Sequence, residues 1–253
     1  MEIGITSVTF RKLDYKAVLK YCVESGLSCI EWGSDIHAPE TDLATVRAVK
    51  EESDKAGIRI CSYGSYYELC VHENYREAFT PYLEAAVILD APIIRLWAGT
   101  MGADKATKEY YGQAVQEAQT LCDMAAEYGI TLAFEYHRNS LSDTADSAVQ
   151  IYKDINRKNF ALYYQYDSQI SIEENIISLE KMLPYIKMVH VAYFDSKYKK
   201  LSLEEGDGIT LWTRLVELLK EHQVEVCLLF EFLKDDSLEG LKYEMKIMER
   251  IVC

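Results

Sequence analysis

The sequence predicts a (β/α)₈ (TIM) barrel, formed by residues 1–253 as a single domain. Short apolar stretches that are typical of buried strands alternate eight times with longer segments of helical periodicity. Regular βα repeats favour a parallel sheet, and eight of them favour closure of that sheet into a barrel. The open alternative, a doubly wound sheet, is disfavoured because no GxGxxG motif follows the first strand.

Each element is expected where an apolar run or a helical spacing lies between chain-breaking residues. The expected strands are EIGITS within residues 1–9, then 28–32, 58–63, 93–97, 130–135, 160–166, 187–193 and 224–231. The expected helices cover 13–25, 43–56, 75–89, 108–128, 147–155, 173–183, 212–221 and about 238–251. Gly26, Gly57 and Gly129 each follow a helix as a C-terminal cap would, and Pro184 stops another.

Composition excludes several classes of function. The formal net charge of −14 disfavours binding to nucleic acid, and no apolar run approaches the roughly 20 residues that span a membrane. The seven cysteines are scattered without a CxxC motif, and the N-terminus lacks the pattern of a signal peptide. These features predict a cytoplasmic protein with reduced cysteines.

Three ionisable residues stand at the ends of apolar strands, where burial statistics disfavour a charge. Glu135 lies in ITLAFEYH, Glu231 in CLLFEF and His190 in MVHVAYF. The alternative is that the three residues are unrelated and each is satisfied by its own backbone partner. That explanation suits a single such residue, but three on strands of the same type favour a shared site. Two carboxylates and an imidazole suit a divalent metal ion.

Other strand ends supply candidate substrate-binding residues, because barrel enzymes carry their chemistry at the carboxyl ends of the strands. These candidates are Glu31, Trp32, Tyr66, Arg95, Trp97 and His137. Arg95 could fix a substrate oxygen or instead pair with Glu31 as a structural ion pair. The aromatic residues could form a wall for a sugar ring or belong to the core.

The motifs together resemble the sugar phosphate isomerase/epimerase-like proteins of the xylose-isomerase-like barrel superfamily. The resemblance rests, in order, on GITSVTF, IEWGSDIHAPETD, SYGSYYEL, APIIRLWAG, FEYHRNSLSDT, YYQYDS, HV and FEFLKDDS. It implies that Glu135, His190 and Glu231 are three of four metal ligands. Relatives place an aspartate at the end of strand six, followed by a histidine. Here Gln165 stands at that position, Asp167 follows two residues later, and either could be the fourth ligand.

The resemblance implies a metal-dependent isomerase or epimerase that acts on a small carbohydrate or sugar phosphate. Mn²⁺, Mg²⁺, Zn²⁺ or Co²⁺ would polarise the substrate oxygens, and Glu135 and Glu231 would move the proton through an enediolate. A dehydratase or lyase and a sugar-binding barrel without catalysis remain alternatives, and a homo-oligomer is left open. A hydrolase like endonuclease IV is disfavoured, because five histidines and the acidic charge do not suit a multi-metal nuclease.

Overall fold

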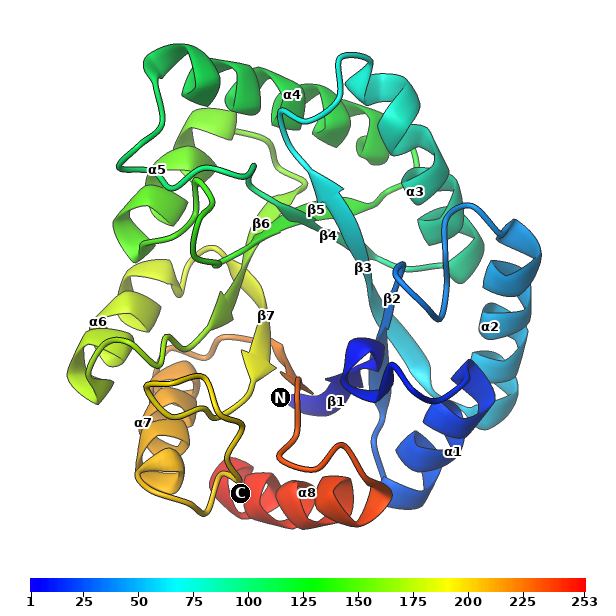
Figure 1. The fold of residues 1–253 in the computed structure, drawn as a ribbon, viewed down its shortest axis with the longest axis vertical. Helices are drawn as coiled ribbons and strands as arrows, with labels where there is room; N and C mark the ends of the chain where they lie inside the picture. The colour runs from blue at the N-terminus through cyan, green and yellow to red at the C-terminus, as the bar shows by residue number, and fades with distance from the viewer.

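The computed structural model describes residues 1–253 and confirms the predicted barrel. Eight parallel strands close in sequence order, with β8 paired to β1, and the helices surround them (Figure 1). The strands are β1 (Glu2–Thr6), β2 (Cys29–Gly33), β3 (Arg59–Glu68), β4 (Ile93–Trp97), β5 (Thr131–Glu135), β6 (Phe160–Gln165), β7 (Ile186–Val191) and β8 (Cys227–Phe230).

Eight α-helices and one short 3₁₀ helix follow the strands along the chain. They are η1 (Ser7–Phe10), α1 (Tyr15–Ser25), α2 (Leu43–Ala56), α3 (Tyr75–Leu89), α4 (Lys108–Ala126), α5 (Ala145–Ile155), α6 (Ile172–Met182), α7 (Gly208–Glu221) and α8 (Leu238–Val252). Gly26 and Gly57 adopt the left-handed conformation that ends α1 and α2, as the sequence predicts. No helix has both the length and the apolar character that crossing a membrane requires.

Two features depart from the predicted elements. β3 continues to Glu68 instead of ending at Tyr63, because its last residues pair with β4 across an irregular register. α7 begins at Gly208, four residues before the expected start at residue 212. A Cβ at Gly208 would lie 2.5 Å from the carbonyl oxygen of Leu203, so this close approach needs glycine.

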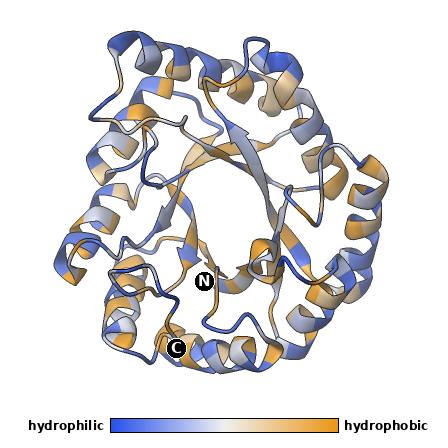
Figure 2. Cartoon of the chain, viewed as in Figure 1, coloured by the Kyte–Doolittle hydropathy of each residue, from blue (hydrophilic) through white to orange (hydrophobic).

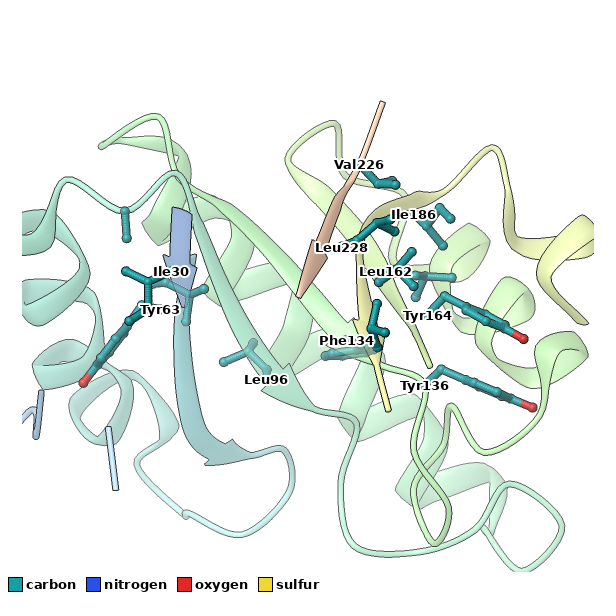
Figure 3. Packing of buried hydrophobic residues seen from close by; sticks show 14 of the residues in the cluster. Ile30, Tyr63, Leu96, Phe134, Tyr136, Leu162, Tyr164, Ile186, Val226 and Leu228 are labelled. Carbon is teal, nitrogen blue, oxygen red and sulfur yellow. The ribbon is translucent and has the colours of Figure 1, made fainter. Parts of the chain in front are cut away.

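The main core lies between the strands and the helices. It is one cluster of 63 buried residues, part of which Figure 3 shows, and hydrophilic residues gather on the outer faces of the helices (Figure 2). Burial of apolar surface in this layer is the main favourable contribution to stability. The helices are thereby held against the outside of the barrel.

A smaller cluster fills the barrel interior beneath the carboxyl ends of the strands. Its members are Cys29, Cys61, Ile93, Ala133, Ala161, Tyr163, Met188, Cys227 and Leu229. Successive side chains of a strand alternate between the two faces of the sheet. Glu135, His190 and Glu231 follow Ala133, Met188 and Leu229 by two positions, so they also point to the barrel axis.

Candidate active site

The carboxyl ends of the strands surround a cavity of about 450 Å³. The cavity is lined by eight of the predicted residues: Tyr66, Arg95, Trp97, Glu135, His137, Gln165, Asp167 and Glu231. His190 and Glu31 are more deeply buried and contact the charged residues of the lining. This location is the one at which barrel enzymes carry their active sites.

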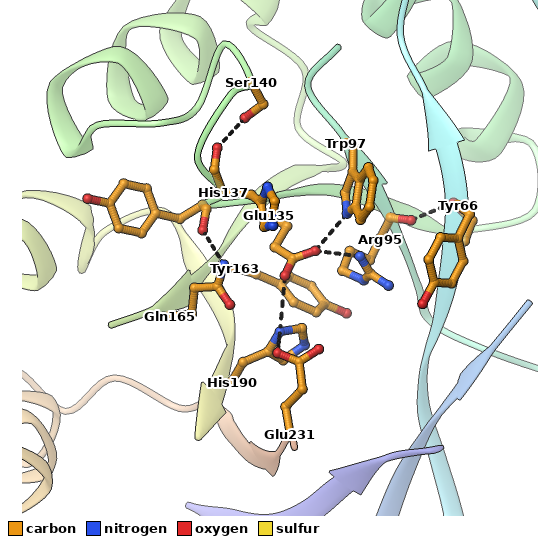
Figure 4. Close-up of polar contacts among 12 residues, drawn as sticks. Tyr66, Arg95, Trp97, Glu135, His137, Ser140, Tyr163, Gln165, His190 and Glu231 are labelled. Atoms are coloured by element: carbon orange, nitrogen blue, oxygen red, sulfur yellow. Dashed lines mark hydrogen bonds and ion pairs between the residues drawn. The ribbon is translucent and has the colours of Figure 1, made fainter. Parts of the chain in front are cut away.

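Glu135, His190 and Glu231 meet at the inner end of the cavity (Figure 4). One ligand atom from each lies within 4.8 Å of the others. His190 Nδ1 is 3.5 Å from Glu135 Oε1 and 3.4 Å from Glu231 Oε2. Both ring nitrogens of His190 are buried without a hydrogen-bond partner. Buried ring nitrogens without a hydrogen-bond partner, next to two carboxylates, are donors that fit a divalent ion.

The two carboxylates of this group have different surroundings. Arg95 Nη1 forms an ion pair with Glu135 Oε2, and Trp97 Nε1 donates to the same oxygen at 2.8 Å. Burial alone would raise the pKa of Glu135, but Arg95 and His190 hold it well below its usual range. Glu231 contacts His190, and no protein group donates a hydrogen bond to its side-chain oxygens. Glu135 is therefore held in place through one oxygen, while both oxygens of Glu231 remain available.

Glu31 lies outside the cavity lining, within the barrel. Ser62 Oγ and Tyr163 Oη donate to its Oε2 at 2.8 and 3.0 Å, and Arg95 Nε lies 3.5 Å from its Oε1. Burial opposes ionisation, but His190 and Arg95 lower the pKa of this carboxyl. Glu31 was predicted to bind substrate, whereas its contacts here are to protein groups. Arg95 forms the predicted ion pair with Glu31 and also lines the cavity.

The electrostatic surroundings of His190 favour a positive charge, either on its ring or on an ion beside it. Burial alone would lower its pKa, but the carboxylates of Glu231, Glu135 and Glu31 raise it well above the usual histidine value. Three buried carboxylates face one guanidinium, that of Arg95. The site thus carries two uncompensated negative charges when His190 is neutral. A bound cation or a protonated His190 would reduce this excess.

The two candidates for the fourth ligand, Gln165 at the end of β6 and Asp167 just after it, make different contacts. Gln165 Nε2 donates to the carbonyl oxygen of Tyr136 at 2.8 Å, which leaves its Oε1 unused (Figure 4). Asp167 accepts from the backbone N–H of Gln169 at 2.8 Å and is absent from the three-residue group. Both line the cavity, but the carboxylate of Asp167 is engaged in the loop.

An aromatic wall forms one side of the cavity. The rings of Trp97 and His137 stack with centroids 5.3 Å apart, and Tyr66 packs on Trp97 at 5.6 Å. His137 Nδ1 lies 2.8 Å from the carbonyl oxygen of Arg138, so this nitrogen donates. The Nε2 atom of neutral His137 is then an acceptor.

Trp32 does not join this wall, contrary to the sequence prediction. Its ring is fully buried, its Nε1 donates to Ser53 Oγ of α2 at 3.1 Å, and it is absent from the cavity lining. The alternation that turns Glu31 inward turns Trp32 outward, into the layer between strands and helices.

The sequence interpretation missed several residues of the cavity mouth. Among them are three cations and two aromatic residues: Arg11, Arg138, Lys200, Tyr198 and Phe232. They lie in irregular segments or in the short helical turn region after β1, where neither periodicity nor burial signals a role. Tyr163 was also missed, although its parity with Gln165 places it inside the barrel.

The comparisons agree with the fold. A family model described as a xylose isomerase-like TIM barrel matches residues 19–251. The 3-dehydroshikimate dehydratase of Bacillus anthracis is 19% identical in an alignment of length 204, with 75% of this chain and 71% of that protein covered. A solved structure of the probable 3-DHS dehydratase AsbF from the same organism has a TM-score of 0.83 at 16% identity, covering 98% of this chain and 99% of that chain.

Two further solved structures are similar over almost their whole length. The IOLI protein with a bound zinc atom has a TM-score of 0.81 at 19% identity, covering 100% of this chain and 98% of that one. A D-allulose 3-epimerase from Methylomonas sp. has a TM-score of 0.80 at 14% identity, covering 99% and 98%. At these identities the structural likeness shows the fold alone.

Proposed function

Since the chain belongs to the xylose isomerase-like TIM barrel family, we propose that it is a divalent-metal-dependent isomerase or epimerase of a small carbohydrate. The observation that carries the proposal is the meeting of Glu135, His190 and Glu231 at the inner end of one cavity. Relatives in this family are described as epimerases and as a dehydratase, and both reactions involve a proton next to a carbonyl.

The donor set supports a metal of intermediate or hard character. Carboxylate oxygens and an imidazole suit Mn²⁺, Mg²⁺, Zn²⁺ or Co²⁺, and a relative of the same fold holds zinc. A divalent charge would balance the two negative charges that Arg95 leaves uncompensated. Glu135 would bind through Oε1, because Arg95 and Trp97 occupy Oε2. Arg95 and Trp97 would orient the Glu135 carboxylate, as groups that hydrogen-bond to a metal ligand usually do.

We expect Gln165→Ala to weaken Mn²⁺ binding at least tenfold and Asp167→Ala to leave it nearly unchanged. The reason is that Gln165 shares the inward parity of Tyr163 and keeps its Oε1 unused, whereas Asp167 Oδ1 accepts from the backbone N–H of Gln169 in the loop. Tenfold corresponds to about 1.4 kcal/mol. Isothermal titration of each metal-free variant with Mn²⁺ measures the difference. Equal losses in both variants, or a larger loss for Asp167→Ala, would contradict the assignment of Gln165.

The ion, when bound, would supply polarisation of the substrate's carbonyl and hydroxyl oxygens. The chain's own groups would move the proton. Glu231 is the better base, because no guanidinium or indole donates to it. Glu135 faces the cavity from β5, roughly across from β8, and would return or remove a proton on the second face.

The remaining lining residues would position the substrate. The wall of Tyr66, Trp97 and His137 offers apolar surface to a sugar ring, and His137 Nε2 would accept from a hydroxyl. Arg138 lies over the Tyr198 ring at 3.9 Å and pairs with no carboxylate, so it would be free to bind an anionic group. This arrangement supports a small polyhydroxylated substrate that carries a phosphate or a carboxylate.

A dehydratase is a second candidate, and the asymmetry of the two carboxylates favours it. Epimerisation needs a base on each face of the reacting carbon, whereas loss of water next to a carbonyl needs one base and a proton for the leaving hydroxyl. The ion pair between Arg95 and Glu135 reduces the basicity of one of the two groups. The similarity to a 3-dehydroshikimate dehydratase supports the same reaction class.

A substrate panel in D₂O tests both candidates. It would contain ketoses, inososes, their phosphates and β-hydroxy ketones with a carboxylate, each with Mn²⁺, Mg²⁺, Zn²⁺ or Co²⁺. An isomerase or epimerase should give a new sugar signal with deuterium at the reacting carbon by NMR. A dehydratase should give an enone and release water. Absence of any metal-dependent conversion or deuterium exchange across the panel would contradict the proposal.

A further inference from the structure

A second group of metal-ligand side chains lies inside the barrel, away from the cavity. The sulfur atoms of Cys29 (β2), Cys61 (β3) and Cys227 (β8) lie within 4.8 Å of one another. Cys29 and Cys61 are fully buried, and Cys227 is 8% exposed. None of the three lines the cavity of the candidate active site.

The surroundings of the three sulfurs are specific. Gly4 on β1 lies between β2 and β8, and a Cβ there would lie 2.6 Å from Cys29 Sγ. The glycine therefore leaves the space that the sulfur occupies. Arg59 Nη2 donates to Cys227 Sγ at 3.3 Å, and Glu2 Oε2 lies 3.5 Å from the same sulfur. Arg59 and Glu2 also form an ion pair with each other.

We propose that Cys29, Cys61 and Cys227 bind a thiophilic metal ion, Zn²⁺ in the first instance. Three thiolates are a soft donor set that zinc accepts, and they supply three of the four positions of a tetrahedral site.

Arg59 would serve the site in two ways. Its positive charge offsets the excess negative charge of three thiolates around a divalent ion. Its hydrogen bond to Cys227 favours the thiolate form, which is the form that binds metal.

The sulfur site and the candidate active site differ in position and in ligand chemistry. Along the strands, Glu31 follows Cys29 by two residues and Glu231 follows Cys227 by four, so the sulfurs lie nearer the amino ends. Thiolates select soft metals, and carboxylates with an imidazole select harder ones. A probe that reports only metal–sulfur bonds can therefore measure the sulfur site alone.

Titration of the reduced, metal-free protein with Cd²⁺ tests the proposal. Cadmium bound to thiolates gives an ultraviolet charge-transfer band, which carboxylate ligation does not give. We expect the band to saturate at one equivalent of Cd²⁺ and to remain in Glu231→Gln. In Cys227→Ser, the apparent affinity for Cd²⁺ obtained from the band should fall at least tenfold. Cys122→Ser is the matched control, because Cys122 is an equally buried cysteine on α4 outside the group.

A further measurement does not depend on substituting a buried cysteine. In the wild-type protein, Zn²⁺ should protect Cys29, Cys61 and Cys227 from alkylation during partial unfolding, as read by peptide mass spectrometry. A missing band, an apparent Cd²⁺ affinity in Cys227→Ser that equals the wild-type value, or alkylation that Zn²⁺ does not slow would overturn the proposal.

Discussion

Glu231→Gln is expected to lower kcat by about 10²–10⁴-fold while the protein keeps its divalent metal. The amide retains an oxygen for the ion but cannot accept a proton. Glu231 is the carboxylate whose oxygens are not engaged by a guanidinium or an indole, so its loss should remove the main base. The measurement is turnover of the substrate identified by the panel, with metal content determined first on the same sample.

Glu135→Gln separates the two reaction classes. An epimerase needs both bases, so this variant should also lose turnover but still exchange the substrate proton with solvent through Glu231. A dehydratase or a one-face isomerase should retain more activity in Glu135→Gln than in Glu231→Gln. Glu217→Gln, on the outer helix α7, is the control for the loss of one negative charge. Near wild-type turnover in metal-loaded Glu231→Gln would exclude Glu231 as the base.

Arg95→Met is expected to destabilise the metal-free protein by about 3–5 kcal/mol, because it leaves Glu31 and Glu135 buried without their cation. Urea unfolding in the presence of a chelator measures the change in the free energy of unfolding. Adding Glu31→Gln to Arg95→Met should recover part of the loss, since one buried charge is then removed.

Arg157→Met is the matched control for Arg95→Met. Arg157 pairs with Asp123 at 2.7 Å, but its side chain is 33% exposed and that of Asp123 is 61% exposed, so water screens the pair. Exposed pairs contribute at most about 1 kcal/mol, so this variant should change stability little. A loss at Arg95 no larger than that at Arg157 would show that the buried ion pairs do not stabilise the fold.

The pH dependence of stability should distinguish wild type from Arg95→Met. The pKa values of Glu31 and Glu135 are lower in the folded state than in the unfolded state, where they are about 4.3. The two carboxylates therefore contribute fully to the free energy of unfolding above about pH 4.3, and this contribution is lost as the pH falls towards the folded-state pKa values. Metal-free wild type should therefore lose stability on acidification below about pH 4. Arg95→Met should lose less, because one of the two groups that lower both pKa values is gone and only His190 remains.

The sequence was sufficient to predict the barrel and the inward direction of its key carboxylates. Apolar runs and helical spacing identify the elements, and the two-residue alternation places Glu135 above Ala133 and Glu231 above Leu229. The same alternation, applied to Trp32, would have placed it outside the barrel, so that error came from ignoring parity in favour of residue type.

Other parts of the site depend on contacts that no local pattern encodes. From the sequence, Glu31 could be named as an ion-pair partner of Arg95, but Glu135 could not. The distance between side chains of β4 and β5 depends on how the barrel closes. The choice between Gln165 and Asp167 depends on hydrogen bonds to Tyr136 and Gln169 in loops without periodicity. Loops also supply Arg138 and Lys200, whose approach to the cavity follows from tertiary structure alone.

The stacking of Trp97 on His137 gives the protein a built-in optical reporter. The chain has three tryptophans, and two of them are fully buried with indole donors bound to Ser53 Oγ and to the carbonyl oxygen of Ala192. Only Trp97 touches an imidazole, a carboxylate and the cavity at once. Its fluorescence should therefore change when a ligand enters, while the emission of the other two stays constant as an internal reference.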